Sequence, residues 1–219
     1  MTDIAASDRI GTVDGRIALI RPPRRPGAPL VFAFHGTGGD ESQFAELLAR
    51  LAPEAGVIAP RGEVSEHGAA RFFRRRAEGV YDMDDLRARR DALIGWVEAR
   101  RAEHPDAPAW GLGYSNGANI LAAMAFEAPG LFGRLALLHP LIPWTPAPQP
   151  GLAGVPVLIG AGARDPIAPA SATRTLEAWF QAQGARTRLA MHAGGHEIRP
   201  EELSALAAFL GETDDRPDP

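Results

Sequence analysis

Six short runs of the sequence are rich in apolar residues, and this pattern constrains the fold more than any other feature. The runs cover residues 29–36, 56–60, 107–114, 134–140, 155–162 and 186–193. Strands without polar alternation are typical of a parallel sheet that is covered on both faces. Between the runs, apolar residues recur at three- and four-residue spacing over 41–52, 83–104, 117–128, 171–184 and 201–212, which predicts helices. The sequence therefore predicts an α/β fold, with a mostly parallel central sheet and helices on both faces.

The length of the chain favours one folded unit. A chain of 219 residues with 45% hydrophobic content can bury one sizeable core, so we expect a single domain over 1–219. Residues 1–28 are expected to add an N-terminal strand or hairpin, and residues 212–219 a frayed tail. Residues 62–83 lack clear periodicity, and a connection of this length inside a compact domain is often a lid, so we expect a flap there.

Composition excludes several classes of function. The chain contains neither cysteine nor lysine. Disulfides, thiolate metal sites, cysteine nucleophiles, lysine Schiff bases and lysine-dependent phosphate loops are therefore ruled out. The net charge of −4 argues against a nucleic-acid partner. The sequence shows no apolar run of about 18 residues and no signal-peptide pattern, so we expect a cytoplasmic protein without membrane insertion.

The stretch GLGYSNGANI at 111–120 allows two interpretations. A dinucleotide-binding G-x-G-x-x-G would need glycine where Asn116 stands and an acidic residue ending the next strand, and neither is present. The same residues match G-x-S-x-G completely, from Gly113 to Gly117. In that motif the serine occupies a strained turn between strand and helix, and side chains at the two glycines would collide with neighbouring chain. The stretch therefore predicts Ser115 as a nucleophile.

The partners of such a serine follow in the expected order along the chain. An acid and then a histidine should lie on loops after later strands. Asp165 follows the run 155–162, and His196 follows the run 186–193. His196 is predicted to accept the proton of Ser115, while Asp165 orients the imidazole. The backbone N–H groups of Thr37 and Asn116 are predicted to form the oxyanion hole.

The remaining histidines suggest structural roles. None of the six histidines forms a metal-spaced pair such as H-E-x-x-H, so we expect no metal site. His35 is expected to brace its loop and His192 to be structural. His139, at a strand end, is compatible with either the core or a pocket wall.

Four stretches, HGTGGDE, GYSNGAN, GARDPIAP and GGHEI, together resemble the phospholipase/carboxylesterase family of serine hydrolases within the α/β-hydrolase superfamily. The match runs from about Pro29 to Leu210. RFFRRRAEGVYDMDDL and LHPLIPW look more specifically like a bacterial subgroup of hydrolases linked to quinone and hydroquinone stress. The resemblance implies an α/β-hydrolase fold, the triad Ser115, Asp165 and His196, and esterase activity without a cofactor. Asn116 replaces the family's usual glutamine, which leaves the backbone donor intact but changes the pocket.

Six apolar side chains are predicted to line an acyl or aryl pocket. They are Phe72, Phe73 and Tyr81 from the flap, and Leu141, Ile142 and Trp144 from the opposite wall. The arginine-rich run 71–76 is either a surface segment or the source of a guanidinium that meets an acidic substrate group, and the sequence does not choose among its arginines.

The sequence as a whole predicts a serine carboxylesterase that acts on small to medium carboxylic esters through an acyl-enzyme on Ser115. Its expected partner is a small-molecule ester. Three alternatives remain: a thioesterase or lysophospholipase, a hydrolase of products of aromatic-ring metabolism, and a non-catalytic ligand receptor on the same fold. A homodimer also stays open.

Overall fold

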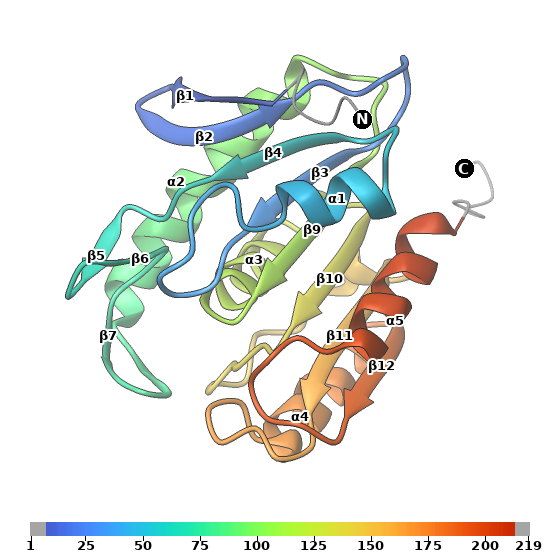
Figure 1. Ribbon diagram of the computed structural model, residues 1–219. Helices are drawn as coiled ribbons and strands as arrows, with labels where there is room; N and C mark the ends of the chain where they lie inside the picture. The colour runs from blue at the N-terminus through green and yellow to red at the C-terminus, as the bar shows by residue number, and fades with distance from the viewer. Residues whose placement is uncertain (1–7, 213–219) are drawn as a thin grey trace.

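A computed structural model describes residues 8–212 and is built around one eight-stranded sheet (Figure 1). Its strands are β1 (Arg9–Val13), β2 (Arg16–Arg21), β3 (Leu30–Phe34), β4 (Gly56–Pro60), β9 (Ala109–Tyr114), β10 (Arg134–Leu138), β11 (Pro156–Gly162) and β12 (Arg186–His192). The order across the sheet is β1-β2-β4-β3-β9-β10-β11-β12. The pairs from β4 to β12 are parallel, while β1 with β2 and β2 with β4 are antiparallel. All six predicted parallel strands are present, but β12, expected to be buried, lies at the edge of the sheet and is mostly half-buried or exposed.

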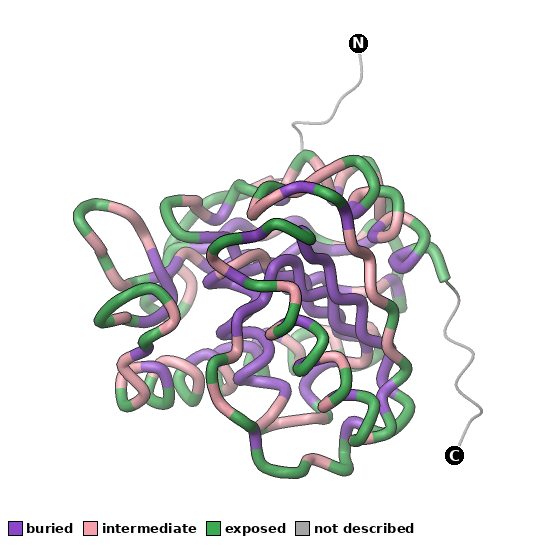
Figure 2. Tube along the Cα trace, turned by 90° about the horizontal axis from the view of Figure 1, so that it is seen from below, coloured by how far each residue is buried: buried purple, intermediate pink, exposed green. Residues whose placement is uncertain are grey.

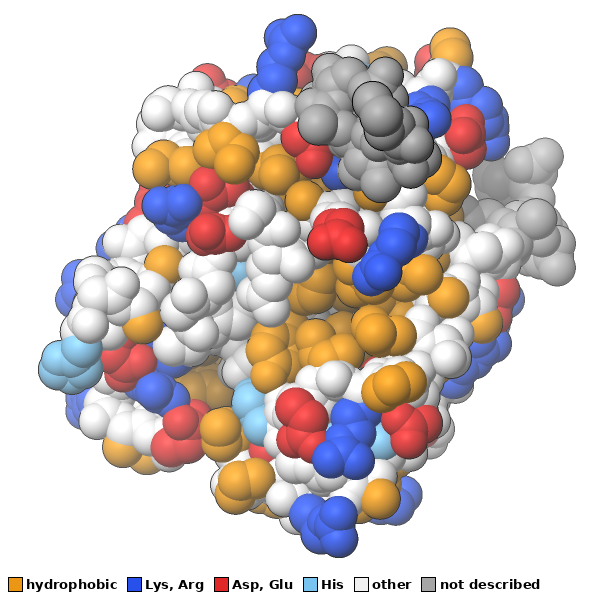
Figure 3. Space-filling model, in the orientation of Figure 1, with side chains coloured by type: hydrophobic (Ala, Val, Ile, Leu, Met, Phe, Trp, Pro, Cys, Tyr) orange, Lys and Arg blue, Asp and Glu red, His pale blue; other side chains and the backbone are white. Residues whose placement is uncertain are grey.

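Helices cover both faces of this sheet. They are α1 (Ala45–Leu51), α2 (Met83–Ala102), α3 (Asn116–Glu127), α4 (Ala170–Ala182) and α5 (Pro200–Gly211). In Figure 1, α1 and α5 lie in front of the sheet and α2, α3 and α4 behind it. Each face has its own apolar core, and Figure 3 shows apolar side chains gathered between α1 and α5. The predicted α/β class is confirmed, and no helix within residues 8–212 is both long and apolar enough to cross a membrane.

Local sequence explains where these elements begin and turn. The β1–β2 hairpin, predicted within residues 1–28, turns at Asp14 and Gly15, whose φ angles of 47° and 80° suit a two-residue turn with left-handed positions. Asp82 caps α2 by accepting the backbone N–H of Asp85 at 3.2 Å. Pro200 opens α5, where a missing N–H costs nothing. The predicted frayed tail falls, apart from residue 212, outside the described residues.

The segment 62–83, expected to be an irregular flap, is two small hairpins. The first joins β5 (Val64–Glu66) to β6 (Ala69–Arg71), and the second joins β7 (Arg75–Ala77) to β8 (Val80–Tyr81). Strands of two or three residues are too short to show a two-residue period, so these strands leave no pattern in the sequence. A 3-10 turn, Pro150–Leu152, also interrupts the proline-rich stretch 141–154.

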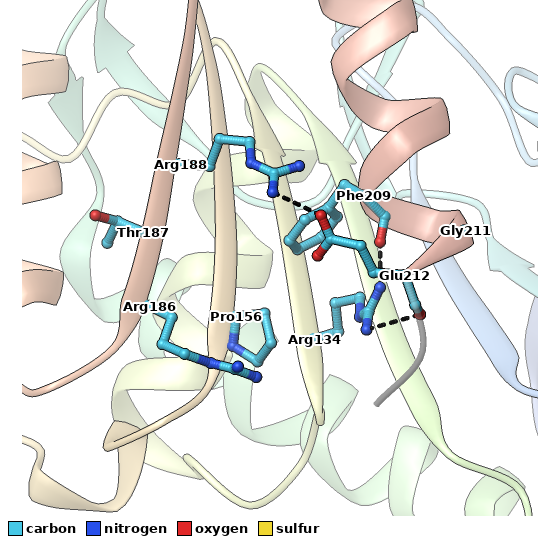
Figure 4. Close-up of a pocket in the computed structure, with 8 residues that line it drawn as sticks. All are labelled: Arg134, Pro156, Arg186, Thr187, Arg188, Phe209, Gly211 and Glu212. Carbon is cyan, nitrogen blue, oxygen red and sulfur yellow. Dashed lines mark hydrogen bonds and ion pairs between the residues drawn. The ribbon is translucent and has the colours of Figure 1, made fainter. Parts of the chain in front are cut away.

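The parallel strands all finish at one edge of the sheet, and the loops at that edge carry Ser115, Asp165 and His196. Figure 2 views the molecule from this side and shows buried backbone in the centre, surrounded by exposed loops. A cavity of about 520 Å³ lies at the opposite edge, where β10, β11 and β12 begin (Figure 4). Two of its three arginines are engaged with the end of α5: Arg188 pairs with Glu212, and Arg134 donates to the carbonyls of Phe209 and Glu212. The predicted nucleophile lies at the other edge.

Candidate active site

Ser115 stands in a strained turn between β9 and α3. Its φ and ψ are 52° and −117°, a left-handed conformation that is rare for residues other than glycine. The N–H of Ser115 donates to the carbonyl of Leu138 at 2.8 Å, which ties the turn to the neighbouring strand. A strained backbone at a single serine is a feature of functional sites, and the rest of the structure must hold it in place.

Close packing of the two flanking glycines makes this turn possible. A Cβ on Gly113 would lie 2.6 Å from the carbonyl oxygen of Gly117. A Cβ on Gly117 would collide with the carbonyls of Phe34 and His35 at the end of β3. The predicted need for glycine at both positions is therefore confirmed.

Gly117→Ala is expected to destabilise the fold by about 1–3 kcal/mol or more, because the new methyl group meets rigid backbone. Gly95→Ala is the matched control: it lies in α2, a Cβ there meets nothing within 4 Å, and alanine favours the helix by about 0.5–1 kcal/mol. Urea unfolding of both variants measures the difference. Equal stabilities would show that the turn relaxes around the methyl group.

The structure brings Ser115, His196 and Asp165 into hydrogen-bond contact. Nε2 of His196 lies 2.8 Å from Oγ of Ser115, and Nδ1 of His196 lies 2.7 Å from Oδ2 of Asp165. Asp165 is buried, whereas Ser115 and His196 are half-buried beside the cavity. This geometry lets the imidazole accept the serine proton while its other nitrogen donates to the carboxylate.

Asp165 is held in its ionised form by several donors. Its Oδ1 accepts the backbone N–H groups of Ile167 and Ala168 at 2.8 and 2.9 Å, and its Oδ2 faces the rings of His139 and His196. Burial opposes the charge, but the N–H of Ala168 and the two histidines outweigh burial, so the pKa of Asp165 lies below its usual value. Asp165 is therefore a carboxylate at neutral pH.

The predicted oxyanion-hole residues flank the serine. Asn116 is the first residue of α3, where a backbone N–H has no acceptor within the helix. Thr37 lines the same cavity, and its hydroxyl accepts a hydrogen bond from Nη1 of Arg71 at 2.7 Å. His35 braces this loop, as predicted: its Nδ1 lies 2.7 Å from the carbonyl of Gly36, and its Nε2 accepts the N–H of Gly62 at 2.9 Å.

The segment 62–83 is fastened to the site. The N–H of Phe72 donates to Oδ1 of Asn116 at 2.7 Å, and the N–H of Gly38 donates to the carbonyl of Ala70 at 3.0 Å. The Asn116 side chain therefore joins the serine turn to the flap. Among the arginines of 71–76, Arg71 reaches the cavity, where Glu66 lies 3.3 Å from it.

The predicted pocket is only partly observed. Tyr81 and Leu141 line the cavity above Ser115, together with Thr37, Arg71, Glu78, Asn116, Asn119, His139, Ile167 and His196. Phe72 and Phe73 do not: they are buried at 1% and 0% exposure in the core, where Phe72 packs against His35 and Phe34. Ile142 and Trp144 pack against the same core from outside and are also not among the lining residues. The apolar character that suggested a pocket here serves the core instead.

Asn119 was not predicted, although it connects two walls of the cavity. Its Nδ2 donates to the hydroxyl of Tyr81 at 2.8 Å, and its Oδ1 accepts the N–H of Leu141 at 2.7 Å. The Tyr81 hydroxyl in turn donates to the carbonyl of Leu141 at 2.9 Å. Asn119 lies four residues after Ser115, and this spacing places both on one side of a helix turn, which is the signal that could have found it.

Comparison with known proteins agrees with the fold. The model of the dienelactone hydrolase family matches residues 17–197. MhqD of Bacillus subtilis, which carries the name of a hydrolase, is 34% identical over 185 residues, covering 84% of this chain and 92% of MhqD. A solved protein of unknown function from Agrobacterium tumefaciens is 48% identical with a TM-score of 0.81, and covers 87% of this chain and 93% of its own.

A second solved structure carries an activity in its name. A carboxylesterase from Bacillus cereus is 31% identical with a TM-score of 0.81, covering 87% of this chain and 91% of its own. The resemblance to α/β-hydrolases, expected from the sequence motifs, is confirmed by these matches. The chain therefore belongs to the dienelactone hydrolase family, a family of carboxylesterase-like hydrolases with the α/β-hydrolase fold.

Proposed function

We propose that this protein is a serine carboxylesterase that hydrolyses small carboxylic esters through an acyl-enzyme on Ser115. The observation that carries the proposal is the unbroken hydrogen-bonded chain from Ser115 through His196 to Asp165, with distances of 2.8 and 2.7 Å. It supports nucleophilic catalysis because the base already contacts the nucleophile and the acid already orients the base.

The reaction would proceed in two halves. Oγ of Ser115 attacks the ester carbonyl while Nε2 of His196 accepts its proton, and the N–H groups of Thr37 and Asn116 stabilise the oxyanion. The C–O bond to the alcohol then breaks, and the alcohol leaves with the proton from His196. Water repeats the sequence on the acyl-enzyme and releases the acid.

The size of the cavity supports a small substrate. The space above Ser115 has a volume of about 10 Å³, which holds about one water molecule. Leu141 and Ile167 are its apolar walls. Its charges are mixed, because Arg71 is matched by Glu66 at 3.3 Å and by Glu78 in the lining. These features favour a short acyl group over the long chain of a lysophospholipid.

The test is a series of p-nitrophenyl esters from acetate to palmitate. We expect kcat/KM to be highest for acetate and to fall at least about tenfold by octanoate, since each methylene beyond the cavity is left without apolar contact or forces the walls apart. Leu141→Ala should shift the preference toward longer chains, whereas Val155→Ala, buried in the core away from the cavity, should not. A preference for palmitate in the unaltered enzyme, or thioesters hydrolysed far faster than matched esters, would contradict the proposal.

A further inference from the structure

Three buried side chains extend the contacts of Asp165 into the interior. His139 follows β10, Glu202 lies in the first turn of α5, and His192 ends β12. Their exposures are 0%, 0% and 4%. Figure 1 shows α5 lying in front of β11 and β12. The Glu202 carboxylate lies against Gly160 of β11. The reaction outlined above uses none of these three groups.

His139 is placed between two carboxylates. Its Nδ1 lies 2.8 Å from Oδ2 of Asp165, and its Nε2 lies 3.2 Å from Oε2 of Glu202. An ionised carboxylate only accepts hydrogen bonds, so both ring nitrogens must donate. An imidazole that donates from both nitrogens is protonated and carries a positive charge. His139 also has a φ of 52°, so the backbone is held in an unfavourable conformation to keep the ring there.

Glu202 requires a positive charge nearby. A carboxylate at 0% exposure is costly to bury unless it is paired. Its Oε2 accepts the N–H of Arg199 at 3.1 Å, as a helix cap would, but its Oε1 has no hydrogen-bond partner. A Cβ on Gly160 would collide with that oxygen, so β11 has glycine where the carboxylate enters. A helix cap does not require its carboxylate to be buried, whereas an ion pair between Glu202 and protonated His139 explains the burial.

The other groups around His139 are compatible with a positive charge on its ring. Nδ1 of His192 accepts the N–H of Gly194 at 2.9 Å, so Nε2 carries the proton in the neutral ring. This Nε2 lies 3.0 Å from Oε2 of Glu202, but the geometry is not that of a regular hydrogen bond. Tyr114, whose ring packs on His139, donates to the carbonyl of His196 at 2.6 Å. Burial raises the pKa of Tyr114 to about 12, so it stays neutral.

A metal ion is the competing occupant of this cluster. His139, His192 and Glu202 offer three ligand atoms within 4.8 Å of one another. A metal would need a lone pair on Nε2 of His192, and the hydrogen bond from Gly194 to Nδ1 places a proton on Nε2 instead. The geometry therefore favours a proton over a metal.

We propose that His139 is a buried imidazolium, fixed by Glu202, that positions Asp165 and lowers the pH at which His196 becomes an active base. The proposal rests on the esterase function argued above. Oδ2 of Asp165 receives a hydrogen bond from each of two rings, so its charge is shared between them. The positive ring of His139 lies 5.0 Å from that of His196 and opposes a second proton there. His139 is a positioning residue, because its contacts are with Asp165 and not with the serine.

The pKa of His139 agrees with this arrangement. Burial opposes its charge, but the hydrogen bonds to Glu202 and Asp165 outweigh burial and raise the pKa above the ordinary histidine value. A group whose pKa is raised by folding stabilises the folded state below its unfolded pKa. That contribution is lost as the pH rises through the raised value.

Glu202→Gln is the test variant. Glutamine keeps the shape and can donate to Nε2 of a neutral His139, whose Nδ1 still donates to Asp165, although the NH₂ group then no longer accepts the N–H of Arg199. We expect kcat/KM in the unaltered enzyme to fall at low pH as His196 protonates, which gives the pH profile an acid limb. In Glu202→Gln this acid limb should move to higher pH by about 0.5–1 unit, because the positive charge near His196 is gone. At a pH on the acid limb the loss is about three- to tenfold, and on the alkaline plateau less than about twofold.

Leu206→Ala is the matched control, because Leu206 is fully buried on the same helix but packs in the apolar core. It should lower the thermal stability without moving the limb. The same pH profile is measured by the rate at which a fluorophosphonate modifies Ser115, which requires no ester. If the fluorophosphonate modifies Ser115 but no ester is hydrolysed, the proposed substrate class is refuted, and the inference on His139 can still be tested with the fluorophosphonate. An unmoved limb in folded Glu202→Gln overturns the inference.

Nitrogen-15 NMR of the histidine rings decides the matter even if Glu202→Gln does not fold. At pH 8 in the unaltered protein, both ring nitrogens of His139 should give the chemical shifts of a protonated imidazole. A neutral tautomer, or one equivalent of zinc in the purified protein, overturns the proposal.

Discussion

Ser115→Ala is expected to lower kcat/KM for the preferred p-nitrophenyl ester by about 10⁴- to 10⁶-fold, the largest effect of any single substitution in this protein. The reason is that Oγ of Ser115 is the atom that forms the acyl-enzyme, and the hydrogen bond from this oxygen to His196 at 2.8 Å has no substitute in alanine. Residual hydrolysis would come from the oxyanion donors acting on bound ester and water.

The measurement needs two controls. Ser204→Ala removes an exposed hydroxyl of α5 that donates only to the carbonyl of Pro200, and its activity should match that of the unaltered enzyme. Intact-protein mass spectrometry should show one fluorophosphonate adduct in the unaltered enzyme and none in Ser115→Ala. If Ser115→Ala keeps more than about one hundredth of the activity, another nucleophile performs the reaction.

Asp165→Asn should have the second largest effect, a fall in kcat/KM of about 10³- to 10⁴-fold with little change in shape. The amide must keep its oxygen toward the N–H groups of Ile167 and Ala168, which hold the present Oδ1 at 2.8 and 2.9 Å. Its NH₂ group then faces His139 and His196, where both rings now donate. His196 must place its proton on Nε2 to accept from the amide, and Nε2 can then no longer accept from Ser115.

The control is Asp106→Asn, an exposed carboxylate before β9 at the far edge of the sheet, which should leave kcat/KM unchanged. The fluorophosphonate rate should fall in parallel with ester hydrolysis in Asp165→Asn, since both reactions need the same base. Asp165→Asn with more than a tenth of the unaltered activity would mean that His196 is oriented by another group.

The sequence by itself determined the architecture and the serine turn. Buried parallel strands are apolar on both faces and helices have a 3.6-residue period, so each main strand and helix has a local signature. The requirement for glycine at Gly113 and Gly117 is likewise local, because side chains there would collide with atoms of the same strand–turn–helix unit and of the strand end beside it. The order of Ser115, Asp165 and His196 then followed from where the strands end.

Only the tertiary structure decided which side chains share the space around that turn. Phe72 and Phe73 have the same apolar character whether they face a pocket or the core, and they are buried in the core because the hairpins of 62–83 fold back onto Asn116 and Thr37. The contact of His139 with Glu202 joins residues 63 positions apart, on β10's loop and α5. No periodicity reports such a pair, because its energy arises from burial and opposite charge, which exist only once the sheet and helix have packed together.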